Sequence, residues 1–169
     1  RRGSLTYIKN TVEEYLSYQP EPYELLIDSQ TVKEKAFLVA CGNASQYGNN
    51  AFIAPHANIQ DGKMDITILS PFGPLDIAPL AIQLFTKQID RNSKIKTFKG
   101  KEVTIIRQNP GVMHLDGEPI MADSRIEISV LPKSLNVLTP ETVSFTEEVQ
   151  NLFGEVTRFF DKKLPYIFR

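Results

Sequence analysis

Two carboxylates flank a glycine in residues 114–120, which read HLDGEPI. Asp-Gly is a strong signal for a tight hairpin turn, because glycine tolerates the positive φ angle that such turns need. Glu118 adds nothing to turn formation, so the acids Asp116 and Glu118 also suggest chemistry. A carboxylate within hydrogen-bond reach of a hydroxyl can accept its proton, as a general base does. In an extended backbone the two acids would share one face. The alternative is a turn that is merely acidic.

A second Asp-Gly pair lies in residues 55–69, which read PHANIQDGKMDITIL. Asn58, Asp61 and Lys63 fall at positions i, i+3 and i+5 around Gly62. A tight turn there can aim two backbone carbonyls and one carboxylate at a single point. Mg²⁺ prefers oxygen ligands and keeps several waters, so this small set is sufficient. The alternative is a plain turn that leads into a strand.

Other candidates for chemistry are weaker. The chain contains neither of the phosphate-binding patterns G-x-G-x-x-G and G-x-x-x-x-G-K-[ST]. His56 and His114 have no partner at metal-ligand spacing, and Cys41 lacks a catalytic signature, so burial is its default. The stretch 42–50 is rich in glycine, asparagine and serine and is typical of a loop between strands.

The elements that must position these residues are mainly strands. Segments 23–28 and 32–41 are expected to pair as a hairpin, and 64–69 alternates as a half-buried strand does. Further strands are predicted at 94–98, 102–107, 112–115 and 125–131. Apolar residues at helical spacing predict a helix after Ser4 and another from Ile77 to near Asp90. This order favours an antiparallel, sheet-dominated α+β domain.

The tail differs in kind from the rest of the chain. Ser144 and Glu147 form a capping-box pattern, and apolar residues between 145 and 160 form a broad stripe. A helix with such a stripe must bury it. The stripe can dock on its own domain, on a second copy of the chain, or on a domain outside this sequence.

Composition limits the class of protein. The chain has 169 residues, 41% of them hydrophobic and 23% charged, which suits one soluble globular domain with an appendage. A net charge of −1 gives little support to nucleic-acid binding. No apolar run is long enough to span a membrane, and no signal peptide opens the chain. Since the sequence begins with Arg1 and not methionine, a fragment or processed product is expected.

Three stretches, taken in order, carry a resemblance to a known family. They are FLVACGNASQYGNNAFIAPHANIQDGKMDITIL, then MHLDGEPI, then IEISVLPKSLNVLTP. Together they resemble the second domain of bacterial diacylglycerol kinase-like lipid kinases, with sphingosine and ceramide kinases as more distant relatives. The resemblance covers residues 3–140. One departure is Gly48-Asn49-Asn50, where many relatives have a run of glycines.

The resemblance implies a fold and a domain organisation. Residues 1–140 would form a two-layer antiparallel β-sandwich with a few flanking helices, and residues 141–169 an amphipathic helical tail. The family's first domain, whose Gly-Gly-Asp-Gly-Thr loop holds the nucleotide phosphates, is absent from this chain. The family's active site lies in the cleft between the two domains.

The resemblance also implies site residues and an activity. The family's Mg²⁺ site falls on the carbonyls of Asn58 and Lys63 and the carboxylate of Asp61, and its catalytic acids fall on Asp116 and Glu118. Which acid is the base stays open. The expected function is ATP- and Mg²⁺-dependent phosphorylation of a lipid hydroxyl, with diacylglycerol the first acceptor, by a cytoplasmic protein at the inner membrane surface. Its partners would be the lipid, its own first domain and a twin chain, and the chain alone would be inactive. The alternative is a non-catalytic β-sandwich that binds a lipid or a protein.

Overall fold

The computed structural model describes residues 18–48 and 50–138. The helix predicted after Ser4, Asn49 and the tail helix predicted at 144–160 lie outside the described residues.

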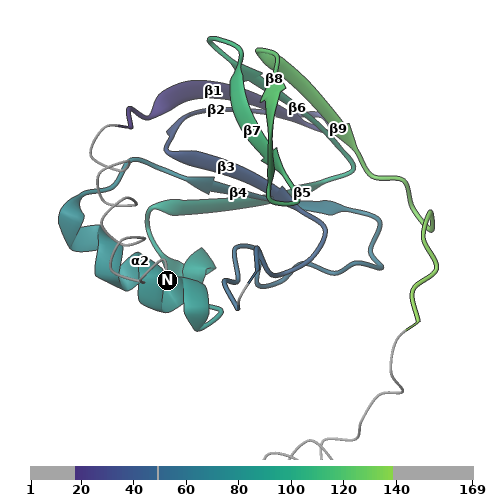
Figure 1. Ribbon diagram of the computed structural model, residues 1–169, viewed down its shortest axis with the longest axis horizontal. Coiled ribbons are helices and arrows are strands. Elements are labelled where there is room, and N and C mark those ends of the chain that lie inside the picture. The colour runs from purple at the N-terminus through teal and green to yellow at the C-terminus, as the bar shows by residue number, and fades with distance from the viewer. Residues whose placement is uncertain (1–17, 49, 139–169) are drawn as a thin grey trace, which may run out of the picture. The chain divides into compact units, whose positions relative to one another are not determined.

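Antiparallel strands dominate the described part of the chain. The first sheet has the order β2-β1-β6-β9, formed by β1 (Glu21–Ile27), β2 (Gln30–Ala36), β6 (Glu102–Arg107) and β9 (Arg125–Ser129). The second has the order β3-β4-β5, formed by β3 (Leu38–Gly42), β4 (Met64–Leu69) and β5 (Ile95–Gly100). A separate hairpin consists of β7 (Gly111–Leu115) and β8 (Glu118–Ala122). Figure 1 shows the first sheet above the second, with α2 (Ile77–Phe85) at one end. The predicted β-sandwich is confirmed.

Alternate residues of both sheets form one hydrophobic core, because successive side chains of a strand point to opposite faces. Leu25 of β1 and Val103 of β6 face Ile66 and Ile68 of β4 in a single buried cluster. Leu25, Ile66 and Ile68 have no exposed surface. Burial of each such side chain contributes about 1.5–3 kcal/mol, so this cluster holds the two layers together.

The chain passes from one sheet to the other at Phe37. The prediction of one strand over 32–41 was wrong, since β2 ends at Ala36 and β3 begins at Leu38 in the second sheet. The backbone N–H of Phe37 donates to the carbonyl of Leu69 at 2.7 Å. Its ring meets those of Tyr18 and Phe72 edge-on, each at 4.9 Å between centroids. Hydrophobic residues continue across this corner, because residues of both β2 and β3 pack in the core. The hydrophobic pattern therefore could not show where one strand ends and the next begins.

Strand β4 is buried on both faces, and the prediction of a half-buried strand was wrong. Met64, Ile66 and Ile68 face the core, while Asp65 and Thr67 are also buried. The hydroxyl of Thr67 donates to the carbonyl of Ile53 at 2.9 Å. This bond ties the segment that precedes the second Asp-Gly turn to the outer face of the sheet.

The predicted helix after Pro74 is confirmed as α2, but it ends at Phe85, before the expected end near Asp90. A separate 3₁₀ turn, η2 (Ile89–Arg91), follows it. Leu80, Ile89 and Ile95 form a second buried cluster that fixes the helix against the start of β5.

Candidate functional site

The acidic turn lies at the tip of the β7–β8 hairpin. Leu115 pairs with Glu118, so Asp116 and Gly117 alone make the turn. Their φ angles are +49° and +93°, the signs that a type I′ turn requires. The tight turn predicted from Asp-Gly is confirmed: Asp116 lies in the turn and Glu118 begins β8. Asp116 and Glu118 are both exposed, so solvent and a substrate can reach both carboxylates.

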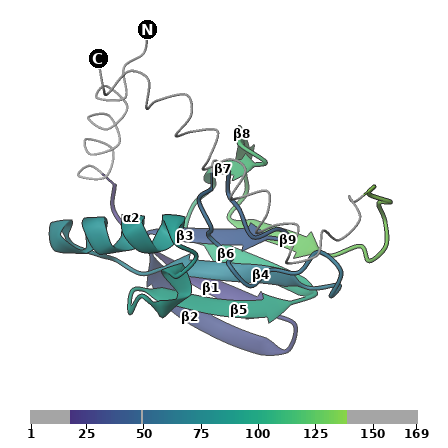
Figure 2. The same cartoon turned by 90° about the horizontal axis from the view of Figure 1, so that it is seen from below.

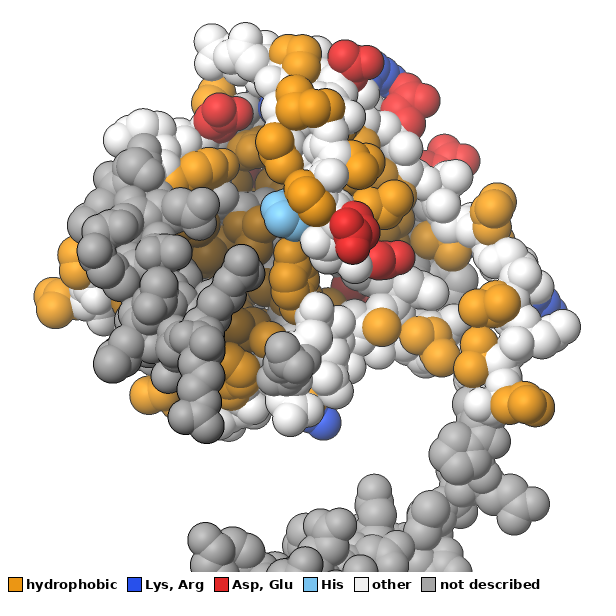
Figure 3. Space-filling model, in the orientation of Figure 1, with side chains coloured by type: hydrophobic (Ala, Val, Ile, Leu, Met, Phe, Trp, Pro, Cys, Tyr) orange, Lys and Arg blue, Asp and Glu red, His pale blue; other side chains and the backbone are white. Residues whose placement is uncertain are grey.

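The hairpin stands apart from the sandwich. Its two strands hydrogen-bond to each other and belong to neither larger sheet. Figure 2 shows β7 and β8 projecting away from the layered strands. Large apolar side chains on it are open to solvent, with Val112 exposed by 59%, Leu115 by 58% and Met121 by 72%. Figure 3 shows acidic side chains and a histidine beside apolar side chains over this hairpin.

The turn at residues 58–63 is ordered by its own hydrogen bonds. The side-chain oxygen of Asn58 accepts from the backbone N–H of Gln60 at 2.9 Å, and its carbonyl accepts from that of Asp61 at 3.3 Å. Oδ1 of Asp61 accepts from the backbone N–H of Lys63 at 2.9 Å. This hydrogen bond lowers the pKa of Asp61 below its usual value, and Lys99 lowers it further. Asp61 therefore presents a charged carboxylate at neutral pH.

Lys99 of β5 joins this turn to the sheet. Its Nζ lies 3.3 Å from Oδ2 of Asp61, 3.2 Å from Oδ2 of Asp65 and 3.1 Å from the carbonyl of His56. Burial by itself would lower the pKa of Lys99, but its interactions with Asp65 and Asp61 outweigh burial and raise that pKa. The ammonium of Lys99 therefore stays charged beside both carboxylates.

The charges and donors at this turn fit a hard cation. Two carboxylates, Asp61 and Asp65, lie beside one ammonium, that of Lys99, and the charge of Lys63 also acts on Asp61. The carbonyl of Asn58 keeps a lone pair after its single hydrogen bond. Within the described residues no group of three or more His, Cys, Asp and Glu side chains is arranged to hold a metal. A cation here would thus rely on one carboxylate, backbone carbonyls and water.

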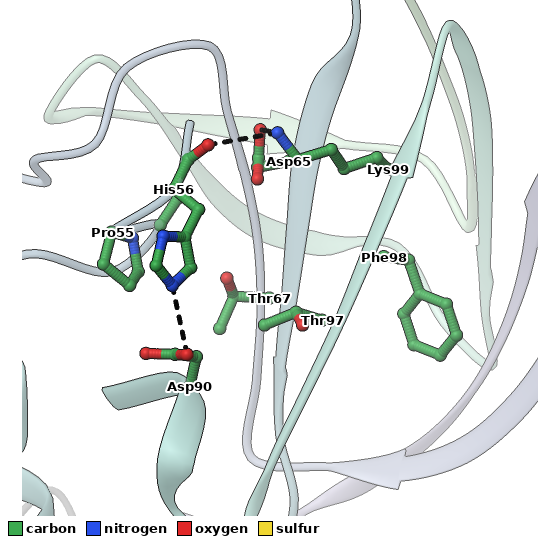
Figure 4. A pocket seen from close by; sticks show the side chains of 9 residues that line it. Pro55, His56, Asp65, Thr67, Asp90, Thr97, Phe98 and Lys99 are labelled. Atoms are coloured by element: carbon green, nitrogen blue, oxygen red, sulfur yellow. Dashed lines mark hydrogen bonds and ion pairs between the residues drawn. The ribbon is translucent and has the colours of Figure 1, made fainter. Parts of the chain in front are cut away.

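A small cavity opens next to this turn. It has a volume of about 220 Å³, and its lining includes His56, Asp65, Asp90 and Lys99. Nε2 of His56 lies 3.3 Å from Oδ2 of Asp90 (Figure 4). Sequence reasoning missed Lys99 of β5 and Asp90 of η2, because both lie far along the chain from the turn. The alternation of β4 points Asp65 away from Met64, Ile66 and Ile68, but no local pattern marks Lys99 or Asp90.

The structure places the predicted residues in two groups. Asn58, Asp61 and Lys63 lie together in one turn, which precedes β4. Asp116 and Glu118 lie at the tip of the hairpin. The two groups therefore belong to different elements of one domain.

Comparisons with known proteins agree with the fold. A diacylglycerol kinase of Mycobacterium tuberculosis is 27% identical over 143 residues, which are 82% of this chain and 44% of that protein. A protein of Shewanella frigidimarina named "Probable lipid kinase YegS-like" is 28% identical over 125 residues, covering 74% of this chain and 40% of that protein. The crystal structure of a diacylglycerol kinase from Bacillus anthracis is similar in fold, with a TM-score of 0.58 at 22% identity, over 77% of this chain and 44% of that one.

This chain thus spans less than half the length of each of these relatives. The family model described as YegS C-terminal NAD kinase beta sandwich-like domain matches residues 1–139. The chain therefore belongs to that family, the C-terminal domains of YegS and diacylglycerol kinase-like lipid kinases.

Proposed function

We propose that this chain is the second domain of an ATP- and Mg²⁺-dependent lipid kinase that transfers the γ-phosphate to a lipid hydroxyl. The observation that carries the proposal is the exposed acidic turn at the tip of the hairpin, on a domain of this family. Diacylglycerol is the acceptor we put first, because the relative from Mycobacterium tuberculosis bears that name.

The proposed chemistry assigns one task to the acidic turn. Phosphoryl transfer depends mostly on positioning, charge compensation and removal of a proton from the acceptor. Either Asp116 or Glu118 accepts the proton of the lipid hydroxyl as the oxygen–phosphorus bond forms, while the other orients the hydroxyl. The phosphates of ATP would be held by a preceding domain, because the chain contains no phosphate-binding pattern. This chain alone is then expected to be inactive.

The 58–63 turn has a separate proposed task. Asn58 and Lys63 through their carbonyls, and Asp61 through its carboxylate, would hold a Mg²⁺ ion. Bound there, the ion would supply positive charge that stiffens the turn.

The place of action follows from the proposed acceptor. No helix in the described part of the chain is long and apolar enough to cross a membrane. A lipid acceptor would require the protein to work at the membrane surface, and cytoplasmic ATP places it at the inner face. The apolar side chains Val112, Leu115 and Met121 beside the acidic turn suit such a surface.

The test uses the complete protein with Asp116→Asn and Glu118→Gln. Loss of a general base lowers the rate by about 10²–10⁴-fold. We therefore expect one variant to show such a loss in ATP-dependent phosphorylation of diacylglycerol, and the other a smaller loss. Asp123→Asn is the matched control, since it changes an exposed acid at the opposite end of the same hairpin. Unchanged turnover in both tip variants would favour the non-catalytic lipid- or protein-binding module.

A further inference from the structure

The orientation of the acidic turn depends on how its hairpin is held. Among the described strands, β7 and β8 pair only with each other, and Figure 2 shows them projecting from the sandwich. Most residues of the two strands are exposed and none is buried, so buried apolar contacts do little to fix the hairpin. Some other interaction must set its angle to the domain.

Arg107, the last residue of β6, supplies that interaction at the open end of the hairpin. Its Nη2 donates to the carbonyls of Gly111 and Ala122, each at 2.6 Å. Its Nη1 donates to the carbonyl of Val112 at 3.4 Å, and its Nε to that of Asp123 at 3.2 Å. One guanidinium thus bonds to both arms of the hairpin.

Only arginine can make this set of bonds. A guanidinium is planar and carries five N–H donors, whereas a lysine ammonium is a point charge on a flexible stem. The backbone of Arg107 is fixed as well, because its N–H donates to the carbonyl of Ser124 at 2.8 Å. Within the described part of the chain, carbonyls and not carboxylates are the acceptors found for this guanidinium. The side chain is therefore committed to the backbone of the hairpin.

The hairpin acts as a lever between Arg107 and the acidic turn. Each arm has five residues, so the tip lies about 13–16 Å from the base at about 3.3 Å per residue. A tilt of about 5° at the base would move the tip by about 1 Å over such an arm. A misplacement of about 1 Å at a reacting centre can lower a rate by about 10²-fold.

We propose that Arg107 is the positioning residue of the acidic turn: it fixes the angle at which the hairpin presents Asp116 and Glu118. This inference rests on the proposed function, because it assumes that those acids act on a substrate. Arg107 touches neither acid in this arrangement and acts through the backbone of the hairpin.

The test compares Arg107→Lys and Arg107→Met with the wild type in the complete protein. Arg125→Met is the matched control, since Arg125 begins the neighbouring strand and its guanidinium pairs with Glu127 at 2.7 Å. The first measurement is amide hydrogen exchange. Loss of charge-assisted bonds should speed exchange of the amides that donate across the hairpin between β7 and β8 by about tenfold or more in both Arg107 variants. Amides of β1 and β4 should keep the wild-type rate, which shows that the domain remains folded.

The second measurement is steady-state kinetics of lipid phosphorylation. We expect kcat to fall by about 10²-fold in both Arg107 variants with KM for ATP unchanged, and Arg125→Met to match the wild type. Wild-type exchange in the hairpin would overturn the inference whatever the activity. A loosened hairpin with wild-type kcat would also overturn it, provided that Glu118→Gln or Asp116→Asn is inactive. If those two variants are active as well, the proposed function has failed, and the inference falls with it.

Discussion

A single lysine organises the second group of candidate residues. Lys99 is the register partner of Asp65 across β5 and β4, and it reaches beyond the sheet to Asp61 and to the carbonyl of His56. The Asp65 side chain is only 11% exposed, and its Oδ2 is shielded from solvent. A carboxylate so placed depends on a nearby cation, because an unpaired buried charge is costly.

We expect Lys99→Met to destabilise the chain by roughly 1–3 kcal/mol, a range reduced because Lys99 itself is partly exposed. Lys96→Met is the control, since Lys96 lies on the same strand and pairs with Glu34 at a more open position. Urea unfolding measures both. The double variant Lys99→Met/Asp65→Asn should recover part of the loss, because it removes the unpaired charge. Equal stability of Lys99→Met and Lys96→Met would show that Asp65 does not need this partner.

At the scale of elements, the turn between β1 and β2 is hydrogen-bonded to the turn between β5 and β6. Asp28, in the β1–β2 turn with φ +49°, accepts at Oδ1 from the backbone N–H of Lys101 at 2.9 Å and of Glu102 at 3.0 Å. Gly100 lies against the same turn, where an added Cβ would come within 2.6 Å of the Ile27 side chain. Only glycine leaves room for this close approach.

The bonds of Asp28 predict an acid-sensitive contact. The backbone hydrogen bonds from Glu102 and Lys101 hold the pKa of Asp28 below its ordinary value of 3.8. A carboxyl whose pKa is lower in the folded state contributes stability above its unfolded pKa and loses it as pH falls through the folded pKa. Stability should therefore decline below about pH 4. Asp28→Asn should show a smaller decline, because an amide does not titrate there.

The measurement is the urea midpoint at about pH 6 and about pH 3 for the wild type and for Asp28→Asn. Asp123→Asn serves as the comparison, since it removes an exposed acid elsewhere in the chain. An equal decline in the wild type and Asp28→Asn would mean that other carboxylates account for the acid sensitivity.

Local sequence patterns predicted most helices and strands. They failed where contacts with residues far along the chain determine the structure. Strands such as β4 and β6 were predicted at their exact bounds, because apolar periodicity depends on neighbours in sequence. The corner at Phe37 was missed, since pairing partners and not local pattern divide β2 from β3. Asp-Gly predicted the hairpin turn, but not that Arg107 holds the hairpin. Lys99 is 38 residues from Asp61, so no local motif could join them.

At the scale of the whole molecule, a bound cation would couple the 58–63 turn to global stability. A ligand that binds only the folded state stabilises it by about 2.7 kcal/mol at one hundred times its Kd. We expect Mg²⁺ to raise the melting temperature of the complete protein, and EDTA to reverse the rise. Asp61→Asn should abolish the effect, because it removes the single carboxylate of the proposed ligand set.

Glu24→Gln is the control for that experiment, as Glu24 pairs with Lys33 on the first sheet. It should keep the full response to Mg²⁺. A rise of equal size in Asp61→Asn would place the responsible ion elsewhere in the protein.

Pro119 in the hairpin affects how molecules of this protein can associate. A lone two-stranded ribbon with valine, leucine and methionine on its surface is a template for strand-by-strand aggregation. Pro119 faces His114, the pair after the one that closes the turn, where N–H groups point outward. Since proline has no N–H, the free edge of β8 lacks a donor at that point. A neighbouring chain therefore finds no donor at that point, which disfavours extension of the ribbon along the edge of β8.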